Sequence, residues 1–375
     1  MVYLNNAATS FPKPEAVREA YRKAGDSLPP GQFRSTFENS DEDVFPTCRE
    51  RLGRLLGTGN KDRIFFSSGA TESLNALICG LRIKADDIIT TVTEHNSVLR
   101  PLYNIPQIKG RPRLVSCDET GYVDPERIEA EAGKGGAKAI ILNHCSNVTG
   151  AIQDAKAIGE IARRYGLTYI LDASQSAGCI DVKADDWGVD ALAFTGHKSL
   201  MGIQGTGGYY VREGISFRPL KYGGTGLDSS RITYEDEQYE YEVGTQNGVG
   251  IAVLSAAAAW VLEQGVEKIA EKEAGLMGYL NDGLSGIRGI RTIGTSDRPT
   301  GPVLSFTSDT LDPSDLAYIL QNSYGIVTRA GLHCAPLIHD HIGSGSKGTL
   351  RVSLSYMNSR SDVDALLSAL QEIQG

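Results

Sequence analysis

The sequence predicts an α/β protein with a mainly parallel sheet flanked by helices and a smaller α+β domain. Short apolar runs recur between residues 64 and 211 without alternating with polar residues, as strands buried on both faces do. Patterns with the helical period separate these runs, which is the arrangement of a parallel sheet covered by helices. A chain of 375 residues is also long enough for two domains.

Five apolar runs are the candidate strands of the sheet, at residues 64–66, 88–90, 139–142, 169–171 and 192–194. Two of the helices between them carry apolar stripes, formed by Leu74, Leu77, Ile78 and Leu81 in the first and by Ile158, Ile161, Ala162 and Tyr165 in the second. Gly166 is placed to end the second helix, because glycine readily adopts the left-handed conformation found there.

The chain changes character after residue 211. A Gly-rich and then acidic stretch, residues 222–237, is typical of an exposed loop, and an Ala-rich helix follows over about 250–263. The remainder contains further strands, at 303–306 and 350–353, and an amphipathic helix that begins near Asp362. We therefore expect a large domain at residues 16–249 and a small domain formed by residues 1–15 with 250–375.

Charge and composition exclude several classes of protein. The net charge of −9 and the isoelectric point near 5.3 disfavour a nucleic-acid surface, which needs clustered Lys and Arg. The first ten residues, MVYLNNAATS, lack the basic and apolar regions of a secretory signal, and the most apolar stretch, residues 250–262, is too short to span a bilayer. We expect a cytoplasmic protein with no nucleic-acid or membrane partner.

Cysteine and histidine spacing gives no metal site. The six cysteines lie far apart without a C-x-x-C pair, which fits neither a zinc knuckle nor a disulfide framework. His339 and His341 form an H-x-H pair that could bind a metal, but without further ligands a flexible polar loop is the better interpretation. We therefore predict no bound metal.

Polar residues follow every candidate strand of the sheet. In an open parallel sheet, ligands bind beyond the carboxyl ends of the strands, so these residues are the candidate site. In chain order they are Ser67-Ser68-Gly69-Ala70-Thr71-Glu72, Glu94-His95-Asn96, Asn143-His144-Cys145-Ser146-Asn147, Asp172-Ala173-Ser174-Gln175 and Thr195-Gly196-His197-Lys198.

Each signal is ambiguous when taken alone. The turn at residues 68–71 opens a helix, so its backbone N–H groups could bind a phosphate, yet a Gly turn is more often only backbone geometry. Asp172 could meet a buried cation or could cap a helix. Lys198 could be a desolvated nucleophile or a solvated loop lysine. No dinucleotide G-x-G-x-x-G or Walker motif is present at the first turn.

The combination favours pyridoxal 5'-phosphate (PLP). This cofactor needs a lysine for covalent attachment, an acid beside its pyridine nitrogen, an aromatic ring over its face and a phosphate pocket, and the strand ends supply all four. These motifs, with Asn5-Asn6-Ala7-Ala8-Thr9, resemble the ordered motifs of class V aminotransferases over essentially the whole chain. The resemblance implies PLP-dependent fold type I.

Within that class the chain most resembles the branch of cysteine desulfurases and selenocysteine lyases. The residues that carry this likeness are Arg329-Ala330-Gly331-Leu332-His333-Cys334-Ala335, Leu350-Arg351-Val352-Ser353 and Glu242-Val243-Gly244-Thr245. The sequence departs from the short-loop desulfurases at Ala330 and Leu332, where these commonly carry Thr and His. The departure leaves both the physiological substrate and the sulfur acceptor open.

The resemblance implies a role for each site residue. Lys198 holds PLP, Asp172 pairs with its ring nitrogen, and His95 stacks on the ring. The remaining expected cofactor ligands are Asn147 and Gln175 at the phenolic oxygen, and Ala70, Thr71, Thr195 and His197 at the phosphate, with Thr225 reaching across from a second subunit. Arg351, aided by Asn147, binds the substrate carboxylate, for which a planar guanidinium is suited. Cys334 takes the sulfur, and Lys198, Cys334 and His95 are the catalytic residues.

These roles predict a homodimeric PLP enzyme that converts L-cysteine to L-alanine and leaves a persulfide on Cys334. Its persulfide would pass to a sulfur-acceptor protein, as in iron–sulfur cluster assembly. Alternatives are a selenocysteine lyase, another class V lyase or transaminase in which Cys334 is incidental, and a non-enzymatic scaffold with a PLP fold. A scaffold would not need Lys198, Asp172, His95 and Arg351 together, which argues against the last alternative.

Overall fold

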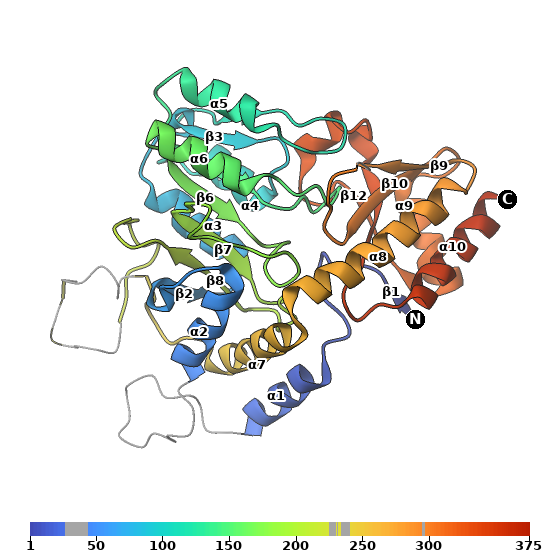
Figure 1. The fold of residues 1–375 in the computed structure, drawn as a ribbon, viewed down its shortest axis with the longest axis horizontal. Coiled ribbons are helices and arrows are strands. Elements are labelled where there is room, and N and C mark those ends of the chain that lie inside the picture. Colours follow the sequence, from blue (N-terminus) through green and yellow to red (C-terminus); the bar gives the residue numbers. More distant parts are fainter. Residues whose placement is uncertain (27–43, 225–229, 231, 234–240, 295–296) are drawn as a thin grey trace.

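The fold is built around two sheets of different kind (Figure 1). We describe it from a computed structural model, which covers residues 1–26, 44–224, 230, 232–233, 241–294 and 297–375. A seven-stranded sheet forms the large part of the molecule, and a four-stranded antiparallel sheet forms the smaller part. Both ends of the chain lie in the smaller part (Figure 1).

The large sheet has the strand order β2-β8-β7-β6-β5-β3-β4 and is parallel except for β8. Its strands are β2 (Ile64–Ser67), β3 (Ile88–Thr91), β4 (Arg113–Val115), β5 (Ala139–Asn143), β6 (Thr168–Asp172), β7 (Ala191–Thr195) and β8 (Gly207–Val211). All five expected strands are confirmed. The sequence reasoning missed β4 and the antiparallel β8.

Helices cover both faces of this sheet. One face carries α3 (Ala70–Gly80) and α4 (Asn96–Asn104), and the other carries α2 (Val44–Leu56), α5 (Pro125–Gly133), α6 (Ala155–Tyr165) and α7 (Gly248–Gln264). Helix α1 (Glu15–Asp26) packs on α7. The predicted helices α3, α6 and α7 are confirmed, and α6 ends at Gly166 in the left-handed conformation. Fold class and helix stops therefore follow from the sequence pattern.

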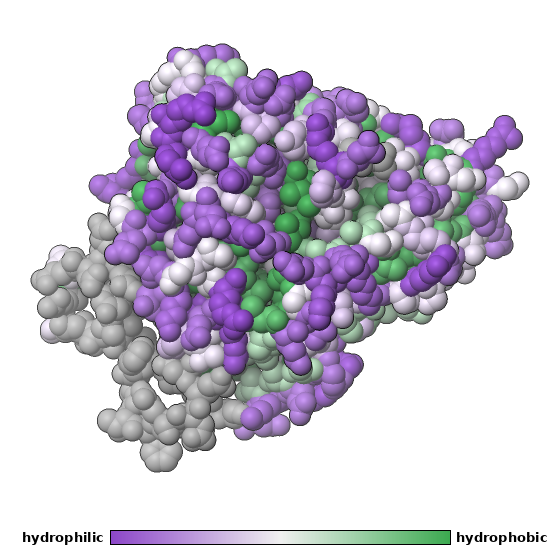
Figure 2. All heavy atoms as spheres, viewed as in Figure 1, coloured by the Kyte–Doolittle hydropathy of each residue, from purple (hydrophilic) through white to green (hydrophobic). Residues whose placement is uncertain are grey.

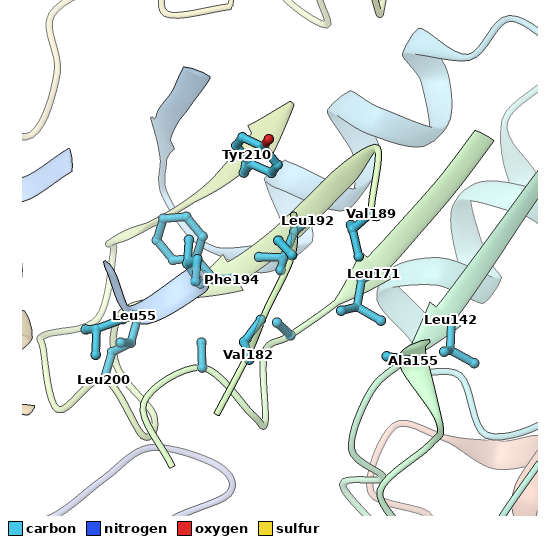
Figure 3. Packing of buried hydrophobic residues seen from close by; sticks show 14 of the residues in the cluster. Leu55, Leu142, Ala155, Leu171, Val182, Val189, Leu192, Phe194, Leu200 and Tyr210 are labelled. Carbon is cyan, nitrogen blue, oxygen red and sulfur yellow. The ribbon is translucent and has the colours of Figure 1, made fainter. Parts of the chain in front are cut away.

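A row of large side chains runs across the centre of the sheet (Figure 3). Leu142, Leu171, Leu192 and Tyr210 are partners in register on four neighbouring strands, and each is at most 2 % exposed. Leu55 of α2 belongs to the same cluster. Burial of one such side chain contributes about 1.5–3 kcal/mol, so this row fixes the relative positions of the strand ends.

The small part contains the antiparallel sheet β12-β13-β10-β9 and a parallel pair formed by the two segments β1 and β11. Its strands are β9 (Ile290–Ile293), β10 (Val303–Ser308), β12 (Arg329–Gly331), β13 (Thr349–Ser353), β1 (Val2–Tyr3) and β11 (Ile326–Val327). Its helices are α8 (Val266–Ser285), α9 (Pro313–Tyr324) and α10 (Arg360–Gln374). The first residues thus pair with a strand of the C-terminal part. The division into domains stays a prediction.

The polarity of the surface and the length of the helices bear on whether the chain could span a membrane. Figure 2 shows a mostly hydrophilic face, with apolar surface gathered where the two parts of the molecule meet beside α8. Over the described residues, no single helix has the length and apolarity to cross a bilayer, while the bent pair α7 and α8 passes that test together. The two helices meet at 77°, and α7 is largely buried in the protein.

Candidate active site

The carboxyl ends of the parallel strands open into one cavity of about 430 Å³. That size falls in the range of small-molecule sites. Ten of the twelve predicted site residues line it: Ala70, Thr71, His95, Asn147, Asp172, Gln175, Thr195, His197, Lys198 and Arg351. Cys334 is held beside the cavity by Arg329, and Thr225 lies outside the described residues.

Lys198 follows β7 and is only partly exposed within the cavity. Burial lowers the pKa of its ammonium to about 8, Asp172 opposes that shift, and the guanidinium groups of Arg351 and Arg329 add to it. An amine with this pKa is largely neutral in mildly basic solution, and only a neutral amine can attack a carbonyl carbon. The solvated-loop interpretation of Lys198 is therefore the weaker one.

The N-terminal segment clamps the peptide of Lys198 in place. Ser10 donates its backbone N–H to the carbonyl oxygen of His197 at 3.0 Å and its hydroxyl to the carbonyl oxygen of Lys198 at 2.9 Å. The Lys13 ammonium donates to the same His197 carbonyl at 3.1 Å and to the Ser10 hydroxyl at 2.7 Å. Sequence reasoning missed Ser10 and Lys13, since they lie about 185 residues from the turn they hold.

Asp172 ends β6 and is 5 % exposed. Its Oδ1 accepts hydrogen bonds from the backbone N–H of Ser174, at 2.9 Å, and from the Ser174 hydroxyl. Burial raises its pKa, whereas the two Ser174 donors and the charge of Lys198 favour the carboxylate. No α-helix begins in the described stretch between Asp172 and β7, so the interpretation as a helix cap does not hold.

His95 is the N-cap of α4, and this fixes its neutral tautomer. Its Nδ1 accepts the backbone N–H of Ser97 at 3.0 Å, so the ring proton resides on Nε2. The Ser97 hydroxyl lies 2.9 Å from the same nitrogen and 2.8 Å from the hydroxyl of Thr71. Burial lowers the pKa of His95 to about 3, and the charges of Lys198 and Arg329 lower it further. The imidazole is neutral near pH 7.

The start of α3 has the properties of a phosphate site. Gly69 is its N-cap with φ of 149°, and Thr71 lies in the first turn, where free N–H groups and the helix dipole favour an anion. Thr195 and His197 line the same cavity, and each has a buried polar atom without a partner among the described residues, Oγ1 and Nδ1 respectively. Such orphaned atoms are costly unless a ligand satisfies them, so the residues present fit the phosphate of PLP.

The small part of the molecule supplies two arginines to the cavity. Arg329 and Arg351 are cross-strand partners on β12 and β13. Arg351 is 1 % exposed; it donates to the backbone oxygen of Asn147 at 2.9 Å and to the Oδ1 of Asn5 at 3.0 Å, while its Nε has no partner in the part that the structure describes. Burial lowers the pKa of Arg351 to about 9, and Arg329 lowers it further. Like charges directly opposite each other favour an anion between them.

Cys334 lies on a turn held from both sides. His333 and Cys334 have φ of 51° and 61°, a conformation that costs a residue other than Gly about 1–3 kcal/mol. The side-chain amide of Asn147 donates to the oxygen of His333 at 2.6 Å, and the N–H of Asn96 donates to the oxygen of Cys334 at 2.7 Å. The Sγ of Cys334 lies 3.3 Å from a guanidinium nitrogen of Arg329, which holds the thiol beside the cavity.

The remaining predictions have simple outcomes. The Gln175 amide donates to the oxygen of Ala7 at 3.0 Å, so this side chain links the cavity to the N-terminal segment. His339 lies in a 3-10 turn, Pro336–Asp340, with its Nδ1 2.7 Å from the Ser344 hydroxyl, while His341 is exposed. Over the described residues, no group of three or more side chains is placed to hold a metal ion.

Comparison with known proteins gives a consistent result. The aminotransferase class-V family model matches residues 2–366. A probable cysteine desulfurase of Methanothermobacter thermautotrophicus is 32% identical, with 100% of this chain and 95% of the relative covered. One of Pyrococcus abyssi is 30% identical, over 100% of this chain and 94% of the relative.

Solved structures of similar fold carry the same description. The apo structure of a cysteine desulfurase from Thermococcus onnurineus has a TM-score of 0.89 at 28% identity, covering 100% of this chain and 94% of that one. The cysteine desulfurase CsdA of Escherichia coli has a TM-score of 0.86 at 28% identity, covering 100% and 95%. The similarity therefore extends over both parts of the molecule.

Proposed function

Because the chain belongs to the class V aminotransferase family, whose members depend on PLP, we propose that it is a cysteine desulfurase in which Cys334 receives the sulfur. One observation carries this proposal. The turn that bears Cys334 is hydrogen-bonded to Asn147 and Asn96, so the thiol is attached to the same cavity that contains Lys198 and Asp172.

The large part of the molecule would hold the cofactor. Lys198 would bind it covalently, Asp172 would face its ring nitrogen, and His95 would cover its ring. Thr71, with Ala70, Thr195 and His197, would receive the phosphate, and Gln175 and Asn147 the phenolic oxygen. When bound, PLP supplies an electron sink that stabilises negative charge at the substrate α-carbon.

The protein's own groups then orient the substrate and move its protons. Arg351 binds the α-carboxylate, because its Nε is unpaired and its guanidinium is already oriented by Asn5 and Asn147. Burial lowers the pKa of the Lys198 ammonium to about 8, so its free amine would serve as the base that takes the α-proton. His95 keeps its proton on Nε2 and can only donate from that atom in its neutral form.

Cys334 performs the sulfur transfer. Its sulfur, held 3.3 Å from Arg329, attacks the sulfur of the substrate as the thiolate, which is the reactive form, so that an S–S bond forms while the Cβ–S bond breaks. The electron pair of the broken bond stays with the carbon fragment, which takes up protons and leaves as alanine. The products are therefore L-alanine and a persulfide on Cys334.

Three further properties belong to this proposal. We propose that the protein is cytoplasmic, on the basis of its acidic, globular composition. The resemblance supports a homodimer in which Thr225 of one subunit completes the phosphate site of the other. A persulfide must be consumed by a thiol acceptor, which we propose to be a protein, as in iron–sulfur cluster assembly.

The test is to add L-cysteine to the PLP-loaded protein and to measure alanine and protein-bound persulfide in the same samples. We expect the two products in equal amounts during the first turnover. Alanine without persulfide on Cys334 would favour a different class V lyase, and a much higher rate with selenocysteine would favour a selenocysteine lyase. Absence of any turnover would favour a scaffold.

A further inference from the structure

A buried carboxyl group outside the mechanism described above lies directly before His95. Glu94 is 0 % exposed and follows β3. Its Oε1 accepts the backbone N–H of Asn143 at 3.0 Å and the hydroxyl of Thr91 at 2.8 Å. Its Oε2 is buried and has no hydrogen-bond partner in the described part of the chain.

Among the described residues, Glu94 has no cationic partner. Within the residues that the structure describes, no Lys, Arg or His side chain makes an ion pair or hydrogen bond with Glu94. Two ionisable groups of β6 interact with it electrostatically: the charge of Asp172 raises the pKa of Glu94, and the charge of Glu94 raises the pKa of Tyr169. Asn143, whose N–H it accepts, is the register partner of Asp172. A fully buried carboxylate without a cation is strongly disfavoured, so this environment favours the protonated acid.

The two neighbouring acids have unequal partners. Burial raises the pKa of both acids. Asp172 has the two Ser174 donors and the attraction of Lys198, which favour its carboxylate, whereas Glu94 has two donors and is repelled by the charge of Asp172. Two carboxyls that interact in this way take different protonation states. The negative charge therefore belongs on Asp172 and the proton on Glu94.

We propose that Glu94 is a positioning residue that acts as a neutral carboxylic acid and leaves Asp172 as the single negative charge where β3, β5 and β6 end. The role follows from the proposed function, because a protonated ring nitrogen on the cofactor needs one ionised partner at Asp172. If Glu94 were ionised as well, its carboxylate would repel that of Asp172, and either Glu94 or Asp172 would take up a proton. Glu94 also holds the end of β5, because its carboxyl oxygen accepts the backbone N–H of Asn143.

Infrared spectroscopy detects directly whether the Glu94 carboxyl group is protonated. We compare the wild type with Glu94→Gln, both with and without PLP, and follow the C=O stretch of protonated carboxyl groups. The wild-type-minus-variant difference at pH 6.5 should contain this band, and it should disappear as the pH passes about 8, the value to which burial raises the pKa of Glu94. Carboxylate bands at pH 6.5 in the same difference would overturn the proposal.

The matched control is Glu273→Gln. Glu273 is a second buried carboxyl, 3 % exposed, and burial raises its pKa to about 8 as well. The band assigned to Glu94 should persist in this variant; if it vanishes there, the assignment and the proposal fail. Should Glu94→Gln not fold, the Glu273→Gln variant labelled with ¹³C-glutamate gives the reading, because the label shifts glutamate bands, leaves those of Asp172 in place, and Glu273 no longer contributes.

Enzyme kinetics of two Glu94 variants distinguish a positioning role of this side chain from a purely structural one. Glu94→Leu removes the acceptor for the Asn143 N–H and should slow alanine formation by about tenfold. Glu94→Gln retains an acceptor oxygen without charge and should recover most of that loss, and its pH profile should lack the change that the wild type shows above pH 8. Equal loss in both variants with unchanged pH profiles would contradict the proposal. The infrared reading in PLP-free protein stands apart from turnover, so failure of the proposed function alone leaves that band present.

Discussion

The two walls of the cavity are built on different principles. The large sheet presents Asp172 and Lys198 at the ends of strands whose side chains are buried on both faces. The small sheet presents Arg329 and Arg351 from an antiparallel pair, next to a left-handed turn that carries Cys334. The first wall is buried and suits a cofactor that must stay in one place, whereas the second is strained and cationic and suits an anionic substrate.

Hydrogen bonds of Asn147 and Asn96 couple these walls beside Cys334. Asn147 donates to the turn through its side chain and accepts from Arg351 through its backbone oxygen, and Asn96 holds the oxygen of Cys334. Because each wall supplies its own groups to the cavity, variants on the two walls should have separable effects. Changes on the large wall should impair cofactor chemistry as a whole, and changes on the small wall should spare cofactor binding.

The largest effect is expected for Lys198→Ala on the large wall. Without this amine the cofactor has no covalent attachment and the α-proton has no base, so kcat should fall by about 10⁴-fold or more. Borohydride reduction and peptide mapping of the wild type should place the reduced cofactor on Lys198. The control is the exposed residue Lys183. In the Lys183→Ala variant, the reduced cofactor should still be found on Lys198, as in the wild type. Label on another lysine would refute this assignment.

Cys334→Ala tests the small wall. The variant should bind PLP and L-cysteine normally and form alanine from L-cysteine at least about 10³-fold more slowly, because no thiolate attacks the substrate sulfur. Selenocysteine has a weaker carbon–selenium bond, so the loss with that substrate should be far smaller. The control is Cys79→Ala, a partly exposed cysteine of α3. Desulfuration at the parent rate would disconnect Cys334 from the reaction.

The Asp172→Asn substitution changes the large wall and is expected to lower kcat less than Lys198→Ala does. The amide cannot stabilise a protonated ring nitrogen, so kcat should fall by about 10²-fold or more while the fold is kept. Steady-state kinetics together with circular dichroism measure both quantities. Near-normal turnover would show that Asp172 only shapes the turn at Ser174.

The smallest effect is on stability and depends on pH. Burial raises the pKa of Glu94 and Glu273 to about 8, so in the folded protein both keep their protons at pH values where the unfolded chain has lost them. Their contribution to stability is complete below the unfolded pKa near 4.5 and is lost as the pH rises through 8, at about 1.4 kcal/mol per pH unit for each group. Urea unfolding at pH 6.5 and 8 measures this loss, and Glu273→Gln should remove about half of it. An unchanged pH dependence in that variant would show that Glu273 is ionised in the folded state.

The sequence predicts the parts of the site that local patterns encode. The apolar runs locate β5, β6 and β7, and the residues after them, such as Asp172 and Lys198, therefore lie at one edge of the sheet. β8 escaped recognition because Gly207 and Gly208 begin it, where glycine is unusual in a strand. The hydrogen bonds from Ser10 to the turn at Lys198 could not be predicted, because no local sequence pattern links two segments so far apart in the chain.

The most direct test of the central claim is mass spectrometry of the PLP-loaded protein after a single turnover with L-cysteine. We expect one additional sulfur atom on the peptide that contains Cys334, removable by a thiol reductant, together with one equivalent of alanine. The five other cysteines should remain unmodified. Alanine release with an unmodified Cys334, or sulfur on a different cysteine, would contradict the assignment of Cys334 as the sulfur-accepting nucleophile.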